Sequence, residues 1–133
     1  MISCTSNEEV KPTNKDLSQS FSVNISSVKS RSKIYPAEYG AWNDITDSSH
    51  PRTIEWNSAT KTITFIYDSS YTKVYENCFF NGNSINFESS IPYGTNGEKM
   101  AVFHNINFDN PNIVTWGSMR GSEWTDRELT IKK

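Results

Sequence analysis

The sequence predicts an all-β fold, and its composition and hydrophobic pattern lead to that prediction. Leu occurs only twice in the 133 residues, at Leu17 and Leu129, whereas helical domains need many good helix formers such as Leu and Ala. Ser, Asn and Thr are abundant, and they favour turns over helices. Apolar residues make up only 35% of the chain and aromatic residues 13%. The core is therefore expected to be small and built largely from aromatic side chains.

Apolar residues at every second position indicate strands with one buried face. The first strand is expected at residues 20–28, where Phe21, Val23 and Ile25 alternate with polar residues. The segments that follow are rich in β-branched and aromatic residues. The further strands are expected at residues 53–56, 62–67, 71–80, 84–87, 100–108, 113–116 and 129–131.

The connections between these segments predict how the strands pair. Asn81 and Gly82 are typical of the two central residues of a type I′ hairpin turn. After Arg52 nearly every connection is short, which favours antiparallel neighbours in meander order. About eight such strands predict a small lipocalin-like β-barrel, with a β-sandwich as the alternative. Residues 29–51 lose the strand period and are interpreted as a long loop.

The N-terminal segment predicts a tether in front of one domain. Residues 1–19 are polar and lack periodicity, so we expect them to be disordered and residues 20–133 to form a single β-barrel domain. Ile2-Ser3-Cys4 resembles the cleavage site of a bacterial lipoprotein signal. That resemblance implies a lipid on Cys4 and a location in the bacterial periplasm or at the cell surface. The alternative is a cytoplasmic protein with a chance cysteine near its start.

Charge and hydropathy exclude some partners. The formal net charge is −2, and the nearest approach to a basic cluster is Lys29, Arg31 and Lys33. We interpret this cluster as part of a solvated loop and expect no nucleic-acid binding. No apolar run approaches the length of a membrane span. Membrane contact is therefore expected only through Cys4, and the domain is expected to be a monomer.

The sequence carries no recognisable catalytic signature. It lacks a Gly-x-Ser-x-Gly elbow, a Gly-rich phosphate loop and the spacing of a zinc site. No enzyme activity, cofactor or metal is therefore expected, although a carboxylate pair distant in sequence stays open. His104 shares a face with apolar residues and is interpreted as a hydrogen-bonded core residue. His50 is expected to be exposed, and Cys78 to be a small buried residue.

The predicted topology resembles that of bacterial lipocalin-like (calycin) lipoproteins. Gly40-Ala41-Trp42 matches the Gly-x-Trp element that opens the first lipocalin strand. In that family the Trp packs across the barrel floor against a basic residue near the C-terminal end. The resemblance implies that Arg120 or Arg127 takes this part here, in a cation–π contact with Trp42. The resemblance implies that the barrel binds a small hydrophobic ligand.

The aromatic residues outside the regular pattern are the candidate ligand contacts. In the first hypothesis a small apolar or amphipathic molecule binds in the barrel mouth. In the second, a module with a filled core binds a glycan or a protein through exposed loop aromatics. In the third, residues 29–51 block a partner enzyme. Trp116 is also a candidate for the core. The predicted lining residues are Tyr35, Tyr39, Trp42, Tyr93 and Trp116.

Overall fold

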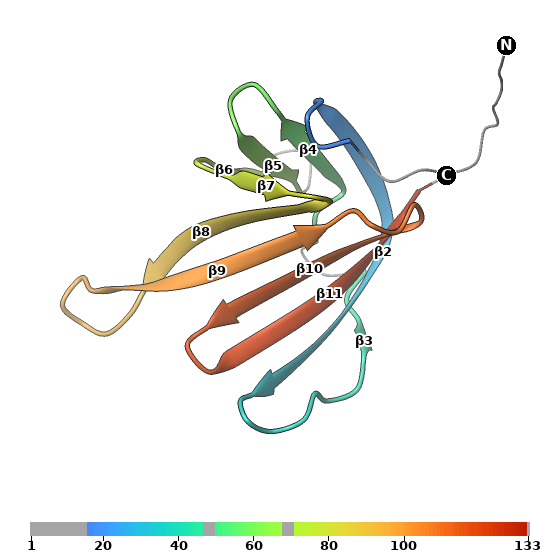
Figure 1. Cartoon of the computed structure of the whole chain (residues 1–133). Helices are drawn as coiled ribbons and strands as arrows, with labels where there is room; N and C mark the ends of the chain where they lie inside the picture. Colours follow the sequence, from blue (N-terminus) through green and yellow to red (C-terminus); the bar gives the residue numbers. More distant parts are fainter. Residues whose placement is uncertain (1–15, 47–49, 68–70, 133) are drawn as a thin grey trace, which may run out of the picture.

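Antiparallel β-strands make up the regular structure of the protein (Figure 1). The computed structural model describes residues 16–46, 50–67 and 71–132. The strands are β2 (Phe21–Ile34), β3 (Asn43–Asp44), β4 (Thr53–Asn57), β5 (Thr62–Ile66), β6 (Thr72–Tyr75), β7 (Phe79–Asn81), β8 (Ser84–Pro92), β9 (Lys99–Asn107), β10 (Ile113–Arg120) and β11 (Glu123–Ile131). The all-β prediction is confirmed. Within these residues no helix is long and apolar enough to cross a membrane.

The strands form one curled sheet in the order β6-β5-β4-β2-β11-β10-β9-β8-β7, with β3 paired to β2. Apart from the contact between β2 and β11, the long strands pair with their neighbours along the chain, as a meander requires. The pairing of the first long strand with the last curls the sheet into a half-barrel (Figure 1). The described chain has ten strands instead of about eight, because the two-residue β3 was not predicted and the predicted strand 71–80 is divided into β6 and β7.

Strand β2 joins the two halves of the sheet. Residues 21–24 pair with β4, and the part from Ile25 to Ile34 pairs with β11. The strand therefore runs six residues beyond the predicted end at residue 28. The sequence pattern does not predict this extension, because residues 29–33 are polar on both faces and so show no apolar residues at every second position.

Two local predictions between β6 and β8 need correction. The predicted strand 71–80 is interrupted at Asn77, whose φ of 58° is one that Asn tolerates. After this break Cys78 is buried, as expected, and its N–H donates to the Lys61 carbonyl. The hairpin turn has Gly82 and Asn83 at its centre, and of the two only Gly82 has a positive φ. This pattern is typical of a type II′ turn rather than the predicted type I′.

The core lies between the two halves of the curled sheet. It is apolar and largely aromatic, as the composition predicts. Its most deeply buried members are Ile54, Trp56, Ile63, Phe65, Ile85, Ile106, Phe108, Val114 and Leu129.

The packed structure begins before the expected boundary at residue 20. Leu17 is 2% exposed, and its carbonyl accepts a hydrogen bond of 2.8 Å from the indole N–H of Trp56. Residues placed in the tether by their polarity thus contribute one side chain to the core. The prediction that His50 is exposed is also wrong, because this side chain is 2% exposed beside the buried Pro51 at the entrance to β4.

Candidate functional site

Exposed apolar side chains form a row across the outer face of β9, β10 and β11. The strand register places Phe103 of β9 opposite Met119 of β10, and Met119 opposite Trp124 of β11. Directly opposite residues on one face are close enough to contact one another. Phe103 is 52% exposed and Met119 43% exposed. The row is therefore an apolar strip in contact with solvent.

A polar row lies beside this strip, two residues along each strand. Asn86, Asn105, Gly117, Asp126 and Arg31 face one another across β8, β9, β10, β11 and β2. The Asn105 amide donates to the Asn86 side-chain oxygen over 2.8 Å. Because Gly117 has no side chain, the row has a gap at its centre. A depression of about 300 Å³ lies here, and its lining includes Tyr39, Asn105, Gly117, Met119, Trp124 and Asp126.

One wall of this outer-face groove comes from the segment after β2. The Gly40 N–H donates to the Ser32 carbonyl over 3.1 Å, and β3 pairs with Lys29 and Ser30. The segment therefore folds back along β2. This return places the rings of Tyr39 and Trp42 over the outward-facing side chains of the strand.

Aromatic rings from outside β2 lie over the cationic side chains of this strand. The guanidinium of Arg31 lies 4.5 Å from the Tyr39 ring centroid and 4.4 Å from that of Trp42. Lys29 lies 5.1 Å from the Trp42 ring, and Lys33 lies within 4.6 Å of the Tyr39 and Trp124 rings. The basic cluster predicted as a solvated loop is thus the outer face of a strand. The strand period of two residues brings its three cations together on that face.

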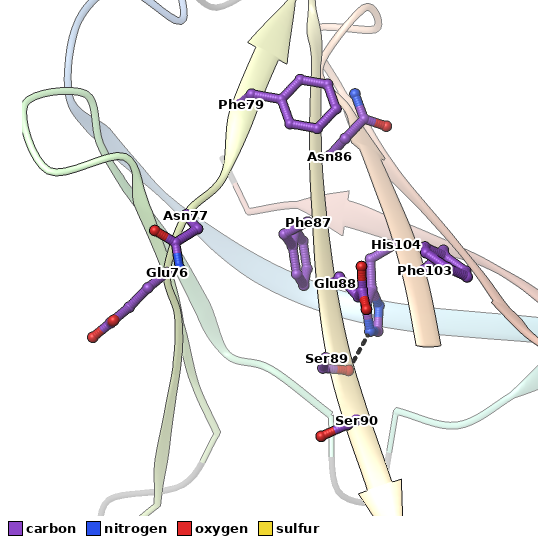
Figure 2. Close-up of a pocket in the computed structure, with 10 residues that line it drawn as sticks. All are labelled: Glu76, Asn77, Phe79, Asn86, Phe87, Glu88, Ser89, Ser90, Phe103 and His104. Atoms are coloured by element: carbon purple, nitrogen blue, oxygen red, sulfur yellow. Dashed lines mark hydrogen bonds between the residues drawn. The ribbon is translucent and has the colours of Figure 1, made fainter. Parts of the chain in front are cut away.

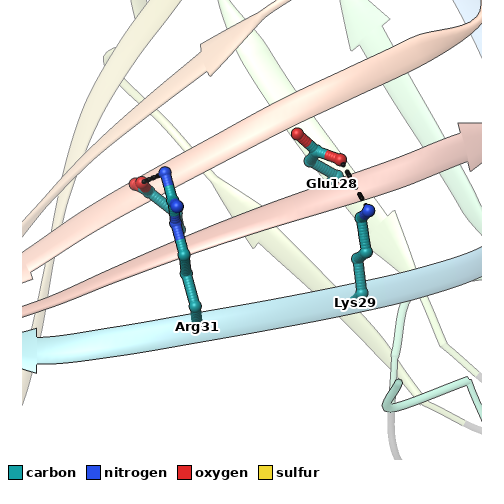
Figure 3. Close-up of polar contacts among 4 residues, drawn as sticks. Lys29, Arg31 and Glu128 are labelled. Atoms are coloured by element: carbon teal, nitrogen blue, oxygen red, sulfur yellow. Dashed lines mark hydrogen bonds and ion pairs between the residues drawn. The ribbon is translucent and has the colours of Figure 1, made fainter. Parts of the chain in front are cut away.

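Acidic residues on β11 neutralise two of these cations. Lys29 Nζ lies 3.3 Å from a carboxylate oxygen of Glu128, and Arg31 Nη2 lies 3.4 Å from Asp126 (Figure 3). The Tyr39 hydroxyl also interacts with Asp126. Partial burial first, and then this carboxylate, raise the pKa of Tyr39 above its ordinary value. The hydroxyl is therefore a neutral hydrogen-bonding group at physiological pH.

The five predicted lining residues lie in three places. Tyr39 and Trp42 are on the outer face beside the groove, and Tyr35 stacks on Trp124 at its end with a centroid distance of 5.2 Å. Trp116 is on the inner face and only 7% exposed. Tyr93 follows β8 and is 57% exposed.

Three apolar or aromatic groove residues were not among the five predicted lining residues: Phe103, Met119 and Trp124. Each occupies a strand position whose side chain points to the outer face of the sheet, where a polar residue is usual. An apolar residue at such a position was the signal that could have identified them. The signal becomes clear only when the strand register is known.

The inner face also holds a cation–aromatic pair. The Arg127 guanidinium lies 4.1 Å from the Trp116 ring centroid and donates to the Ser118 hydroxyl over 3.2 Å. The lipocalin resemblance implied that Trp42 would meet Arg120 or Arg127. In the structure Trp42 instead packs on Lys29 and Arg31, and Arg120 pairs with Glu123.

The sequence correctly placed His104 in the core. It is 8% exposed, and its Nδ1 lies 3.1 Å from the indole nitrogen of Trp116. Because an indole N–H only donates, Nδ1 accepts and the proton of the neutral ring is on Nε2. Nε2 then donates to the Ser89 hydroxyl over 2.9 Å. Burial lowers the pKa of His104 to about 4. His104 therefore positions Ser89 and does not take its proton.

Within residues 16–46, 50–67 and 71–132, no three His, Cys, Asp or Glu side chains are grouped so as to hold a metal ion. None of the family models, curated proteins or solved structures compared with the chain matches it.

Proposed function

We propose that the domain binds a neutral glycan in the outer-face groove. The observation that carries this proposal is the row of the exposed Phe103 and Met119 and the half-buried Trp124 beside a row of amide and carboxylate groups. Exposed apolar side chains gathered on one sheet face are typical of a binding surface rather than of a bare solvated face. The groove volume of about 300 Å³ is within the range of small-molecule sites.

The chemistry of the two rows fits a sugar ring. One face of a pyranose presents C–H groups, which pack on flat apolar surfaces such as the exposed ring of Phe103. Its hydroxyls both donate and accept hydrogen bonds, and Asn105 and Asp126 offer donors and acceptors beside the apolar row. The gap at Gly117 lets a ring approach the backbone of the sheet.

The charges on this face favour a glycan without ionised groups. Lys29 and Arg31 are paired with Glu128 and Asp126, and Lys33 lies over two aromatic rings. A carboxylated or sulfated sugar would have to compete with these acids for the same cations. A neutral sugar needs only to exchange water for the polar groups that line the groove.

The test is titration of the purified domain with neutral hexasaccharides of the cello-, chito-, malto- and manno- series, followed by calorimetry. At least one series should bind, and Trp124→Ala should weaken that binding about tenfold, the effect of losing one aromatic anchor. Phe103→Ser should also weaken it, and this exposed position tolerates a polar residue without loss of the fold. Gly117→Val should block the groove sterically.

Tyr93→Ala is the matched control. Tyr93 is as exposed as Phe103 but does not line the groove, so its replacement should leave the affinity unchanged. If no hexasaccharide binds, or if Phe103→Ser and Gly117→Val bind as tightly as the parent domain, the proposal is wrong.

The other expectations about function remain predictions. Binding of an apolar molecule in the barrel mouth needs a lining on the inner face, where only Trp116 of the five expected residues lies. The lipid anchor at Cys4, on which the periplasmic or surface location rests, lies outside the described residues. Mass spectrometry of the N-terminal peptide from the native source tests it, because a lipidated Cys4 adds the mass of its acyl chains.

A further inference from the structure

The half-barrel is open along one strand edge. β7 pairs with β8 only from Ser84 to Asn86, whereas β9 pairs with β8 along its whole length to Pro92. On the far side of this gap β6 contacts β8 without pairing to it in the described sheet. The segment from Phe87 to Ile91 is therefore an edge strand, and within the described residues one side of its backbone has no pairing strand. Such an edge is a template for one more strand.

The register identifies which backbone groups face this gap. Tyr93 N–H bonds to the Glu98 carbonyl, and hydrogen-bonded pairs recur at every second residue of an antiparallel ladder. The odd-numbered residues of β8 therefore bond to β9. The backbone N–H and C=O groups of Glu88 and Ser90 point the other way, to the free edge, and both residues are exposed.

A groove of about 740 Å³ lies along this free edge (Figure 2). Five consecutive residues of β8, from Asn86 to Ser90, line it. Successive side chains of a strand point to opposite faces, so consecutive residues share one groove only where it follows the strand edge. Five residues correspond to roughly 17 Å of extended chain. The groove therefore has the length and the backbone groups that an extended peptide needs.

The groove is acidic and partly apolar. Glu76 lines its far side and Glu88 the strand itself, and within the described part of the chain neither forms an ion pair. Phe79, which is 62% exposed, and Phe103 provide apolar surface at the same site. Two carboxylates beside a free backbone edge favour a partner that carries positive charge.

We infer that the free edge of β8 binds an extended, basic peptide segment of another protein as an added antiparallel or parallel strand. The peptide backbone would bond to Glu88 and Ser90, and its Lys or Arg side chains would meet Glu76 and Glu88. Pro92 has no N–H and so limits the added strand at that end. This site is separate from the proposed glycan function, although Asn86, Phe103 and His104 line both grooves.

Fluorescence anisotropy with the labelled peptide Lys-Val-Lys-Val-Lys-Val-Lys tests the inference on the whole chain. This peptide should bind, whereas its analogue with every second backbone nitrogen methylated and its Glu-for-Lys counterpart should not. Ser90→Pro removes one edge donor and should weaken binding about three- to tenfold, the effect of one lost hydrogen bond. Ser90→Ala keeps that donor and should bind as the parent does. Glu88→Gln should weaken binding, and Glu55→Gln, on the other half of the sheet, should not.

A second measurement does not depend on the folding of the Pro variant. Peptide binding should slow hydrogen exchange at the Glu88 and Ser90 amides of the unmodified chain. Trp124→Ala should leave peptide affinity unchanged, which separates this site from the glycan groove. The inference is overturned if the lysine peptide does not bind, if the methylated or acidic peptide binds equally well, or if both amides exchange at the same rate with peptide present.

Discussion

Gly117 shows how one missing side chain shapes a surface. It lies between Asn105 and Asp126 in the polar row of the outer face, and a Cβ at this position would lie 3.4 Å from a carboxylate oxygen of Asp126. That contact is tight but faces a flexible side chain, so a larger residue is compatible with the strand. The absence of a side chain at Gly117 therefore deepens the groove, whereas the backbone conformation does not require a glycine there.

At the same scale, His104 predicts how stability depends on pH. Its pKa is about 4 in the folded protein, against an ordinary value of 6.5, because the buried ring is kept neutral. The unfolded chain therefore binds more protons between these two values. The folded protein therefore has its full stability above pH 6.5. As the pH falls from 6.5 toward 4, the free energy of unfolding decreases by up to about 1.4 kcal/mol per pH unit. Urea unfolding at a series of pH values measures it.

The His104→Gln variant is the control for this prediction. Glutamine does not titrate, so the slope between pH 4 and 6.5 should flatten even though the variant is less stable above pH 6.5. A variant that keeps the full slope would show that another group causes it.

At the scale of the element, the β7–β8 hairpin depends on the backbone conformation of its turn. Gly82 has a φ of 63°, which costs a residue with a Cβ about 1 kcal/mol. Gly82→Ala should therefore lower the free energy of unfolding by about this amount. Gly40→Ala is the matched control, because Gly40 lacks a positive φ and its new Cβ would meet nothing closer than 3.8 Å. Thermal unfolding of both variants makes the comparison, and equal melting temperatures would contradict the prediction.

The elements also differ in how well their sequences predict them. The strands with one apolar face, such as β5 and β9, are where the period of two residues placed them. The second half of β2 was predicted as loop, because its inner residues Ser30 and Ser32 are as polar as its outer ones. Its strand conformation comes from pairing with β11, a partner almost a hundred residues away.

At the scale of the whole molecule, Leu17 tests where the packed domain begins. Its side chain belongs to the hydrophobic core, and its backbone carbonyl accepts a hydrogen bond from Trp56. Leu17→Ala should lower the free energy of unfolding by roughly 2–5 kcal/mol, the cost of a cavity in a packed core. Gln19→Ala, at an exposed neighbouring position, should change it little. Chemical denaturation of the two variants compares them, and equal stabilities would place Leu17 outside the cooperative unit.

The sequence by itself determined the all-β class, the antiparallel meander and the aromatic core, because these depend on local propensity, short connections and a period of two residues. It also identified His104 and Cys78 as buried residues. Only the tertiary structure decided that Tyr39, Phe103 and Trp124 share a groove and that β8 keeps a free edge. Both features depend on strand register and on the closure of β2 against β11, which join residues far apart in the chain.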